Sequence, residues 1–331
     1  MNSIIKYIPK DIVFILKSFY LNFISIFDYI YDYKRFKKYS TSTVKYENYQ
    51  KLISKIVMHY HVIEKGLTLK KPRLGFGKEK IEILISLIDK YIEKEYPLKD
   101  TNFLSAISVL NDYVTYHKEH LFDINDLENK LKKYLTYFND LGGRLEISRS
   151  DIMVNIASNF DDFSKSRHSV RNFSSDKVEI ESIYKAIEIA QKSPSVCNRQ
   201  TSKVYIIQDN NKKEAIVNLQ NGNRGFGEFA DKYLVVTSDL NKFWQIGERN
   251  QSFIDGGIFS MSLLYGLHYM GLACCTLNWA VSKNKDKKLK KVLNIPDNEN
   301  IILIIAVGHY PEKLVVCKSN RLVATKVSEL I

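Results

Sequence analysis

The sequence predicts a mixed helix-and-sheet domain (α/β or α+β) over residues 158–331, preceded by an α-helical extension over residues 1–157. In the second half, short β-branched apolar segments alternate with amphipathic segments of helical period, which is typical of a sheet covered by helices. In the first half, apolar residues recur at spacings of three and four. With 45% hydrophobic and 12% aromatic residues, the 331-residue chain can bury a sizeable core.

Residues 11–40 begin with the most apolar segment of the chain and end in a basic cluster at residues 34–38. A signal peptide is not indicated, because a short basic start and a small-residue cleavage site are missing. Lys17 and Asp28 leave ten uncharged residues between them. A membrane-spanning helix needs about 20, which disfavours a span. Two interpretations remain: a helix buried in a core or subunit interface, which we favour, and a helix lying on an anionic membrane surface.

Residues 45–150 predict helices throughout. The clearest is 80–91, whose apolar side chains share one face, and residues 102–116 and 127–138 show the same period. Between the first helices, His59–Lys78 contains Gly, Pro and many polar groups, which predicts a loop. Its two histidines and Glu64 do not share a helix face, so a zinc site is not indicated. We interpret this loop as a cover over the functional site that selects the substrate.

The second half of the chain begins with a polar segment, residues 158–166, which predicts a flexible linker. Residues 178–192 predict an amphipathic helix, and residues 251–270 a long apolar helix that ends at Gly271 as its C-terminal cap. Four apolar, β-branched segments predict strands: residues 203–208, 233–237, 272–277 and 301–308.

The net charge of +12 is spread over the whole chain. Its longest basic cluster, Lys283–Lys291, has the pattern of a solvated helix face, and the basic residues are not gathered with aromatics on one stripe. These features disfavour a nucleic-acid partner. General basicity favours anionic small molecules, above all phosphates.

None of the four cysteines belongs to a CxxC pair, so neither a disulfide framework nor a zinc site is predicted. We expect buried free thiols and a cytoplasmic, reducing environment. They are Cys197, Cys274, Cys275 and Cys317.

Three polar segments, far apart in the sequence, carry candidate site residues. Residues 167–171 (RHSVR) bring two arginines and a serine together, and an arginine offers a fixed fork of donors to phosphate oxygens. Residues 193–200 (SPSVCNRQ) follow a helix that Pro194 ends, and their hydroxyl and amide groups can bind the edge of a planar heterocycle. Residues 318–321 (KSNR) place Arg321 on a tail that can close over a phosphate. Each segment alone also fits an ordinary surface turn or connector.

Together, these segments resemble the nitroreductase-like FMN-dependent oxidoreductase family over residues 158–331. RHSVRNF at 167–173 is followed by a helix and by Pro-Ser-x-x-Asn-x-Gln at 194–200. Gly-Leu-Ala-Cys at 271–274 and Val-Gly-His-Tyr-Pro-Glu at 307–312 follow in the family's order. The resemblance implies an α+β fold with a mostly antiparallel central sheet flanked by helices. It also implies a homodimer with FMN at the subunit interface.

The same resemblance implies which residues bind the cofactor. The phosphate, ribityl chain and pyrimidine edge would meet the first motif, the second motif would reach the flavin from the other subunit, and the tail arginine would hold the phosphate. The backbone of Leu277 and Asn278, at the end of the third predicted strand, would face flavin N5. The implied cofactor-binding residues are Arg167, His168, Ser169, Arg171, Pro194, Ser195, Asn198, Gln200, Asn223, Arg224, Leu277, Asn278 and Arg321.

The implied reaction is hydride transfer through flavin N5 to or from a small organic substrate, with NAD(P)H as electron donor. A cation such as Arg171 or Arg224 near the pyrimidine edge would stabilise the reduced flavin. No side chain is assigned as acid or base, although His168 and Tyr265 are near in the sequence. Thr201-Ser202 replaces the family's frequent Pro-Trp, which puts simple nitroarene substrates in doubt.

Two other functions remain open. One is an FMN oxidase or dehydrogenase that uses O₂ with a dedicated substrate, and the other is a non-catalytic scaffold at a membrane surface. The helical extension is similar to extensions of nitroreductase-like chains associated with surface-polysaccharide synthesis.

Overall fold

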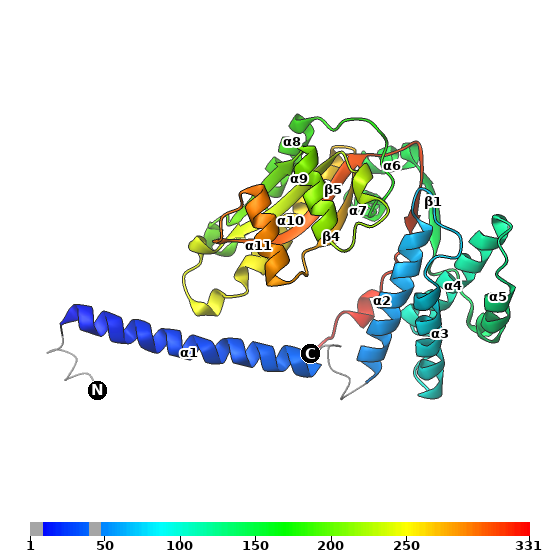
Figure 1. Cartoon of the computed structure of the whole chain (residues 1–331), viewed down its shortest axis with the longest axis horizontal. Coiled ribbons are helices and arrows are strands. Elements are labelled where there is room, and N and C mark those ends of the chain that lie inside the picture. Colours follow the sequence, from blue (N-terminus) through cyan, green and yellow to red (C-terminus); the bar gives the residue numbers. More distant parts are fainter. Residues whose placement is uncertain (1–8, 40–47) are drawn as a thin grey trace. The chain divides into compact units, whose positions relative to one another are not determined.

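The computed structural model describes residues 9–39 and 48–331 of the chain (Figure 1). The chain divides into two compact units, residues 1–55 and 56–331. Residues 56–157, which the sequence assigns to the extension, therefore lie in the same unit as the second half of the chain. The predicted boundary at residue 158 does not coincide with this division.

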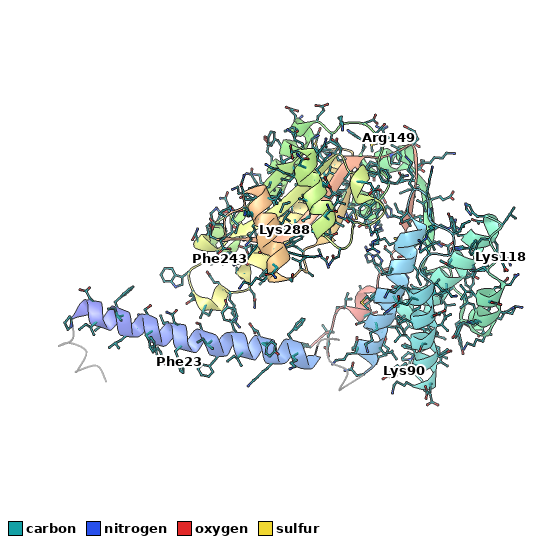
Figure 2. All side chains as sticks on the ribbon, viewed as in Figure 1. Phe23, Lys90, Lys118, Arg149, Phe243 and Lys288 are labelled. Carbon is teal, nitrogen blue, oxygen red and sulfur yellow. The ribbon has the colours of Figure 1, made fainter. Side chains whose placement is uncertain are left out.

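Helix α1 spans Lys10–Tyr39 and exposes large apolar side chains along its length. Phe14, Phe19 and Phe23 are all more than half exposed, and Figure 2 shows side chains projecting both above and below this helix. By length and composition, its segment Asp11–Lys34 is sufficient to cross a membrane, and none of that segment is buried. The ten uncharged residues between Lys17 and Asp28 thus disfavour a membrane-spanning helix, whereas the length and overall apolarity of α1 permit one.

Four helices follow: α2 (Tyr49–Leu67), α3 (Lys78–Glu93), α4 (Thr101–Glu119) and α5 (Asn125–Leu131), the last continued by the 3₁₀ helix η2 (Lys132–Tyr137). They confirm the helices predicted around residues 80–91, 102–116 and 127–138.

The loop predicted at His59–Lys78 is wrong for its first half, because α2 continues to Leu67. Ile56, Tyr60, Ile63 and Leu67 recur at spacings of three and four and are all buried. This apolar face stabilises the helix in spite of the polar residues between its members. The connection between α2 and α3 consists of the turns and bends of residues 68–77.

The prediction that residues 45–150 are helical throughout is also wrong, because β1 spans Arg144–Ser148. It pairs in antiparallel register with β6 (Lys313–Cys317), Leu145 opposite Val316 and Ile147 opposite Leu314. The partner strand lies far away in the sequence, so local period could not show this ribbon. It places the C-terminal tail beside the helical region (Figure 1).

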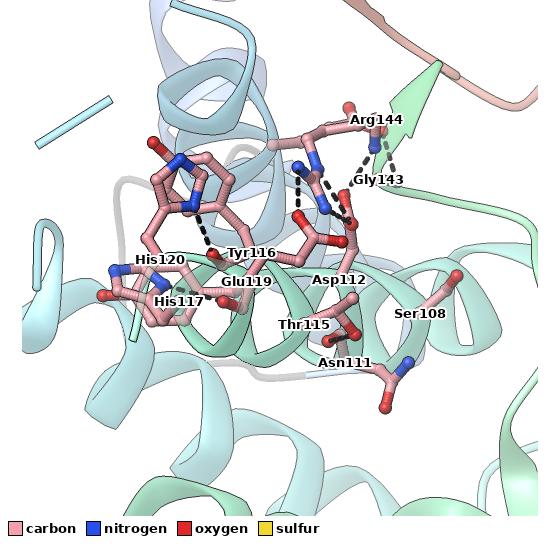
Figure 3. A network of polar contacts seen from close by, with 12 residues as sticks. Ser108, Asn111, Asp112, Thr115, Tyr116, His117, Glu119, His120, Gly143 and Arg144 are labelled. Carbon is pink, nitrogen blue, oxygen red and sulfur yellow. Dashed lines mark hydrogen bonds and ion pairs between the residues drawn. The ribbon is translucent and has the colours of Figure 1, made fainter. Parts of the chain in front are cut away.

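A polar network fixes the turn that leads into β1 (Figure 3). The Arg144 side chain is 2.9 Å from Asp112 and 3.2 Å from Glu119, both on α4. Gly143 has a φ of +106°, and a Cβ at this position would lie 2.7 Å from an Asp112 oxygen. Glycine is therefore needed here both for its backbone angle and for the close approach of Asp112.

The second half of the chain forms the α+β arrangement that the resemblance implied. An antiparallel sheet has the order β2-β3-β5-β4, and helices lie before and between its strands. The strands are β2 (Ser202–Ile207), β3 (Lys232–Asp239), β4 (Leu272–Asn278) and β5 (Glu299–His309), which confirms the four predicted ones. The helices are α6 (Arg149–Ile156), α7 (Phe160–Ser166), α8 (Ile180–Ala190), α9 (Asn210–Leu219), α10 (Gln251–Tyr269) and α11 (Lys283–Leu293).

Helix α7 replaces the flexible linker predicted at residues 158–166. Asn159 caps it, since its side-chain oxygen accepts a hydrogen bond from the backbone N–H of Asp162 at 3.1 Å. Phe163 and Ser166 are buried, so this polar segment is anchored by only a few inward side chains. At the end of α10, Gly271 has a φ of +69°, which confirms the predicted glycine cap.

The sheet is buried on both faces. On β3, Leu234 and Val236 belong to one core cluster with α8 and α10, whereas Tyr233 and Val235 belong to another with α9 and α11. This alternation follows from the two-residue period of a strand. It explains why the sheet strands read as nearly continuous apolar runs.

Candidate functional site

The first motif, residues 167–171, runs along the edge of β4. The backbone N–H of Val170 donates a hydrogen bond to the Cys274 carbonyl at 2.9 Å, and the Val170 side chain is fully buried. Val170 therefore anchors this segment to β4 and to the core, between Ser169 and Arg171.

Beside this motif lies a hollow of about 460 Å³. It brings together Arg167, His168 and Ser169 with Arg321, as the resemblance implied. The full lining consists of Ser164, Lys165, Arg167, His168, Ser169, Met261, Tyr265, Cys317, Lys318, Ser319 and Arg321. The β1–β6 ribbon positions residues 318–321 at the hollow, because β6 ends at Cys317 directly before them.

The hollow is strongly basic and only partly neutralised. Lys165 is paired with Asp161 and Lys318 with Asp140. Within residues 9–39 and 48–331, by contrast, neither an ion pair nor a hydrogen bond is made by the Arg167 guanidinium. Among the described residues, the Arg321 guanidinium donates to the Ser319 carbonyl alone, while its backbone N–H donates to Asn320 Oδ1. Two arginines without carboxylate partners fit a phosphate, which accepts charge-assisted hydrogen bonds from a guanidinium.

His168 lines the same hollow as an uncharged donor. Burial lowers the pKa of its imidazole, and the positive charges of Arg167 and Arg321 lower it further. At neutral pH the ring is therefore neutral, with one nitrogen available to donate and one to accept.

A buried hydrogen-bond network lies next to Arg167, at the start of the first motif. His268 on α10 is fully buried, and its ring nitrogens lie 2.8 Å from the Ser166 hydroxyl and 3.0 Å from the Tyr310 hydroxyl. Burial lowers the pKa of His268 to about 4, and Arg167 contributes in the same direction. This network connects α7, α10 and the end of β5 directly beside Arg167.

We expect this histidine to make stability depend on pH. An unfolded histidine has a pKa of about 6.5, so below that pH the unfolded chain binds a proton that folded His268 resists. The contribution is fully present above pH 6.5 and falls as the pH approaches 4, by about 2–3 kcal/mol at 1.36 kcal/mol per pKa unit. Urea unfolding from pH 7.5 to 4.5 should show this loss in the wild type and a smaller loss in His268→Gln. Identical pH dependence in both proteins would contradict the assignment.

Arg171 lies in a second polar region, on the side of the motif that faces α2. The residue is only 7% exposed. Its Nη1 donates weakly to the Ser169 carbonyl at 3.4 Å and to Cys317 Sγ at 3.5 Å, and its Nε has no hydrogen-bond partner in residues 9–39 and 48–331. Burial raises the pKa of the nearby Cys275 and Cys317 thiols, so both stay uncharged. A buried guanidinium with an unpaired N–H fits the carbonyl-rich pyrimidine edge of a flavin.

The second motif lies elsewhere. Pro194, Ser195 and Gln200 line a separate cavity of about 110 Å³ beside α10, and Asn198 is exposed. The Asp255 carboxylate fixes this loop by accepting from the backbone N–H of Val196 at 3.2 Å. Within one chain, the structure does not bring this motif to the Arg167 hollow.

The backbone of this loop is unusual. Cys197, Asn198 and Gln200 have φ values of +50°, +53° and +50°, in the left-handed region that non-glycine residues seldom adopt. Cys197 is exposed, so the expectation that all four thiols are buried is wrong for this one. Such strained conformations are concentrated at functional loops.

The four remaining predicted cofactor-binding residues differ in how available they are to a ligand. Asn223 is buried and its amide donates to the Val217 carbonyl at 3.1 Å, so this amide already has a structural role. Leu277 belongs to the core, which leaves only its backbone for a ligand. Arg224 and Asn278 are exposed, and the Asn278 carbonyl accepts from Gln220 Nε2 at 3.0 Å.

Sequence reasoning missed two residues of the extension that contact residues next to predicted site segments, one in the loop before Asn223 and one at Cys317. Lys65 Nζ donates to the Gly222 carbonyl at 3.0 Å, and Thr68 Oγ1 lies 3.8 Å from Cys317 Sγ. The apolar period of residues 56–67 was the signal that could have placed them, because it continues α2 up to this point.

Comparison with known families gives one match for this chain. Residues 164–309 match the model of the nitroreductase family. No curated protein matches the chain.

Solved structures are also similar to this chain. A nitroreductase family protein from Streptococcus pneumoniae is 21% identical over 52% of this chain and 100% of its own, with a TM-score of 0.45. An FMN-dependent nitroreductase from Clostridium difficile is 24% identical over 45% and 87%, with a TM-score of 0.39. A nitroreductase family protein from Clostridium novyi is 20% identical over 47% and 87%, with a TM-score of 0.43. The family assignment itself rests on the match of residues 164–309.

Proposed function

We propose that this protein is an FMN-dependent oxidoreductase that passes hydride between NAD(P)H and a small organic substrate. The observation that carries the proposal is the basic hollow, where Arg167 and Arg321 come from distant segments and form no ion pair with a carboxylate of the described residues. When bound, FMN would supply hydride acceptance and donation at N5. The family of residues 164–309 supports this chemistry.

In this proposal the chain's own residues bind and orient. Arg167 and Arg321 hold the phosphate, and Ser169 donates or accepts at the ribityl chain. Arg171 meets the pyrimidine edge, where a buried cation stabilises negative charge more strongly than in water. No side chain of the hollow is assigned to proton transfer.

We also propose that the protein is a homodimer. Ile254, Ile258, Met261 and Tyr265 recur on α10 at spacings of four and three, and the first three are more than a third exposed. Met261 and Tyr265 also line the Arg167 hollow. A second copy seated on this face would cover the apolar stripe and close the hollow. It would also allow the second motif, which lies beside a separate cavity, to reach a flavin held by the partner.

The visible spectrum of the purified protein tests the function. We expect a flavin spectrum that NADH or NADPH bleaches without oxygen and that a small electron acceptor restores. Bleaching only by a sugar-like substrate, followed by reoxidation with O₂, would favour the oxidase instead. Purified protein without flavin, and without uptake of added FMN, would leave the scaffold as the better account. A role in surface-polysaccharide synthesis stays a prediction from the resemblance of the extension.

We further propose that α1 holds a cytoplasmic protein at a membrane surface. A partner protein packed on one side of a helix needs one apolar face, whereas Phe14, Leu16 and Phe19 are exposed at widely different angles around α1. Lys34 and Lys37 are exposed at its C-terminal end. Basic residues near an anionic leaflet contribute about 1 kcal/mol each.

Flotation with liposomes that contain anionic lipid tests this proposal. We expect the full chain to float at low salt, to float less at high salt, and to remain unbound after deletion of residues 1–40. The double substitution Ile15→Glu and Phe19→Glu should reduce binding, whereas Leu121→Glu, an exposed apolar residue elsewhere, should not. Full-length protein that does not float would contradict the proposal, and binding that salt does not weaken would indicate insertion of α1 rather than surface contact.

A further inference from the structure

Contacts through Cys317 connect the end of α2 to Arg171. Thr68, three residues after Lys65, lies 3.8 Å from Cys317 Sγ, to which Arg171 Nη1 donates at 3.5 Å. Lys65 is in the last turn of α2, and its Nζ donates to the Gly222 carbonyl at 3.0 Å. Two residues later in that loop comes Arg224. Leu69 supports the same contact, because its side chain lies 3.1 Å from the position a Cβ would take on Gly225. The end of α2 is thus packed against the loop at residues 222–225.

The backbone around Lys65 is held from several sides. Thr68 Oγ1 donates to the Lys65 carbonyl at 3.0 Å. Glu64 Oε1 accepts from the Gly143 N–H at 3.1 Å, and the Gly143 carbonyl accepts from the Lys318 N–H at 3.1 Å. These bonds connect α2 to the turn before β1 and to the C-terminal tail. Lys65 is therefore positioned by the same turn that positions the tail of the basic hollow.

The region around Lys65 has an excess of positive charge. Burial lowers the pKa of Lys65, and the nearby positive charges of Arg171 and Arg224 lower it further. In the part of the chain that the structure describes, these three residues form no ion pair with a carboxylate. The nearest acid in sequence is the buried Glu64. Its Oε1 accepts from Gly143, and its Oε2 lies 3.6 Å from His61 without a hydrogen-bond partner among the described residues.

Arg171 gives an independent indication that this region takes a ligand. Its side chain is more than nine-tenths buried, and among the described residues its Nε has no hydrogen-bond partner. A buried cation without an ion-pair partner and with an unmade hydrogen bond is destabilising. A ligand that presents carbonyl oxygens, and gains negative charge on reduction, would remove both costs.

We propose that Lys65 contacts the pyrimidine edge of bound flavin together with Arg171, so that the N-terminal extension completes the cofactor site. The inference rests on the proposed function. When bound, FMN would accept two electrons and one proton as hydride at N5, and the resulting negative charge would lie at its N1–C2 carbonyl edge. A cation at that edge favours the reduced form over the oxidised one. The extension thereby sets the reduction potential of the flavin.

The test removes the charge of Lys65 from the full-length, flavin-loaded protein. In Lys65→Met, binding of reduced FMN should weaken at least tenfold relative to oxidised FMN. For a two-electron couple, that tenfold change is a potential about 30 mV more negative, measured by anaerobic dye equilibration. The affinity for sulfite, which adds at N5 and leaves the same negative charge, should fall at least tenfold. Binding of oxidised FMN, measured by fluorescence, should change less.

Two further variants separate charge from structure. Lys65→Gln retains a donor for the Gly222 carbonyl but has no charge, and it should show the same change in potential. Lys71→Met removes a lysine that is exposed just beyond α2, and it should leave the potential and sulfite affinity unchanged.

The possible failures are distinguishable. Flavin-loaded Lys65→Met and Lys65→Gln with wild-type potential and sulfite affinity would overturn the inference alone and leave Lys65 as a structural donor to Gly222. Wild-type protein that takes up no FMN would overturn the proposed function, and this inference with it.

Discussion

Replacing Arg167 with alanine is expected to weaken FMN binding at least tenfold. The Arg167 guanidinium lines the basic hollow, and no partner within the described residues competes for it. A charge-assisted hydrogen bond contributes about 1.5–3 kcal/mol, and about 1.4 kcal/mol corresponds to a tenfold change in affinity. Adding Arg321→Ala should weaken binding by at least a further tenfold. Fluorescence titration of the apoprotein with FMN measures both.

Arg149→Ala is the matched control for these substitutions. Arg149 is also an accessible arginine, but it pairs with Glu312 at 3.3 Å and does not line the hollow. Its replacement should leave FMN affinity unchanged. If Arg167→Ala retained FMN as tightly as the wild type does, the phosphate site would have to be sought elsewhere.

Placing glutamate at Ile254 and Ile258 is expected to convert the dimer into a monomer that loses its flavin. Both side chains are exposed on the α10 stripe, so a separate subunit can still fold. At an interface, by contrast, an unpaired carboxylate has to be buried, which costs several kcal/mol. Flavin should be lost because the second motif would no longer reach it from the partner. Sedimentation and flavin absorbance of the same fractions measure both effects.

Val154→Glu is the control for this substitution. Val154 is 70% exposed on α6 and lies outside the α10 stripe, so a charge there should change neither oligomeric state nor flavin content. If the Ile254→Glu, Ile258→Glu protein sedimented as a dimer with bound flavin, the interface would not involve this face of α10.

The sheet was predictable because its strands are apolar on both faces and come from local stretches of sequence. Residues 272–277, for example, are predicted as a strand and form β4. The strand β1 could not be found in this way, because its apolar residues become meaningful only when β6 pairs with them. Similarly, α7 resembles a linker in sequence because only Phe163 and Ser166 are buried.

The candidate site was predictable only in part. The motif RHSVR identified Arg167, His168 and Ser169, and the tail motif identified Arg321, which the structure brings to one hollow. Lys65 was not assigned, because the apolar period that extends α2 to Leu67 was interpreted as a loop and because its contact with Gly222 lies far along the chain. Because α2 carries many polar residues between its buried apolar ones, local composition alone does not reveal this helix or the lysine near its end.

Native mass spectrometry of the full-length protein tests the central claim most directly, because it counts chains and cofactors in one measurement. We expect a complex of two chains that carries two FMN molecules. A monomer that holds one FMN would contradict the shared site, and a dimer that remains without FMN after incubation with the cofactor would contradict the flavin assignment itself.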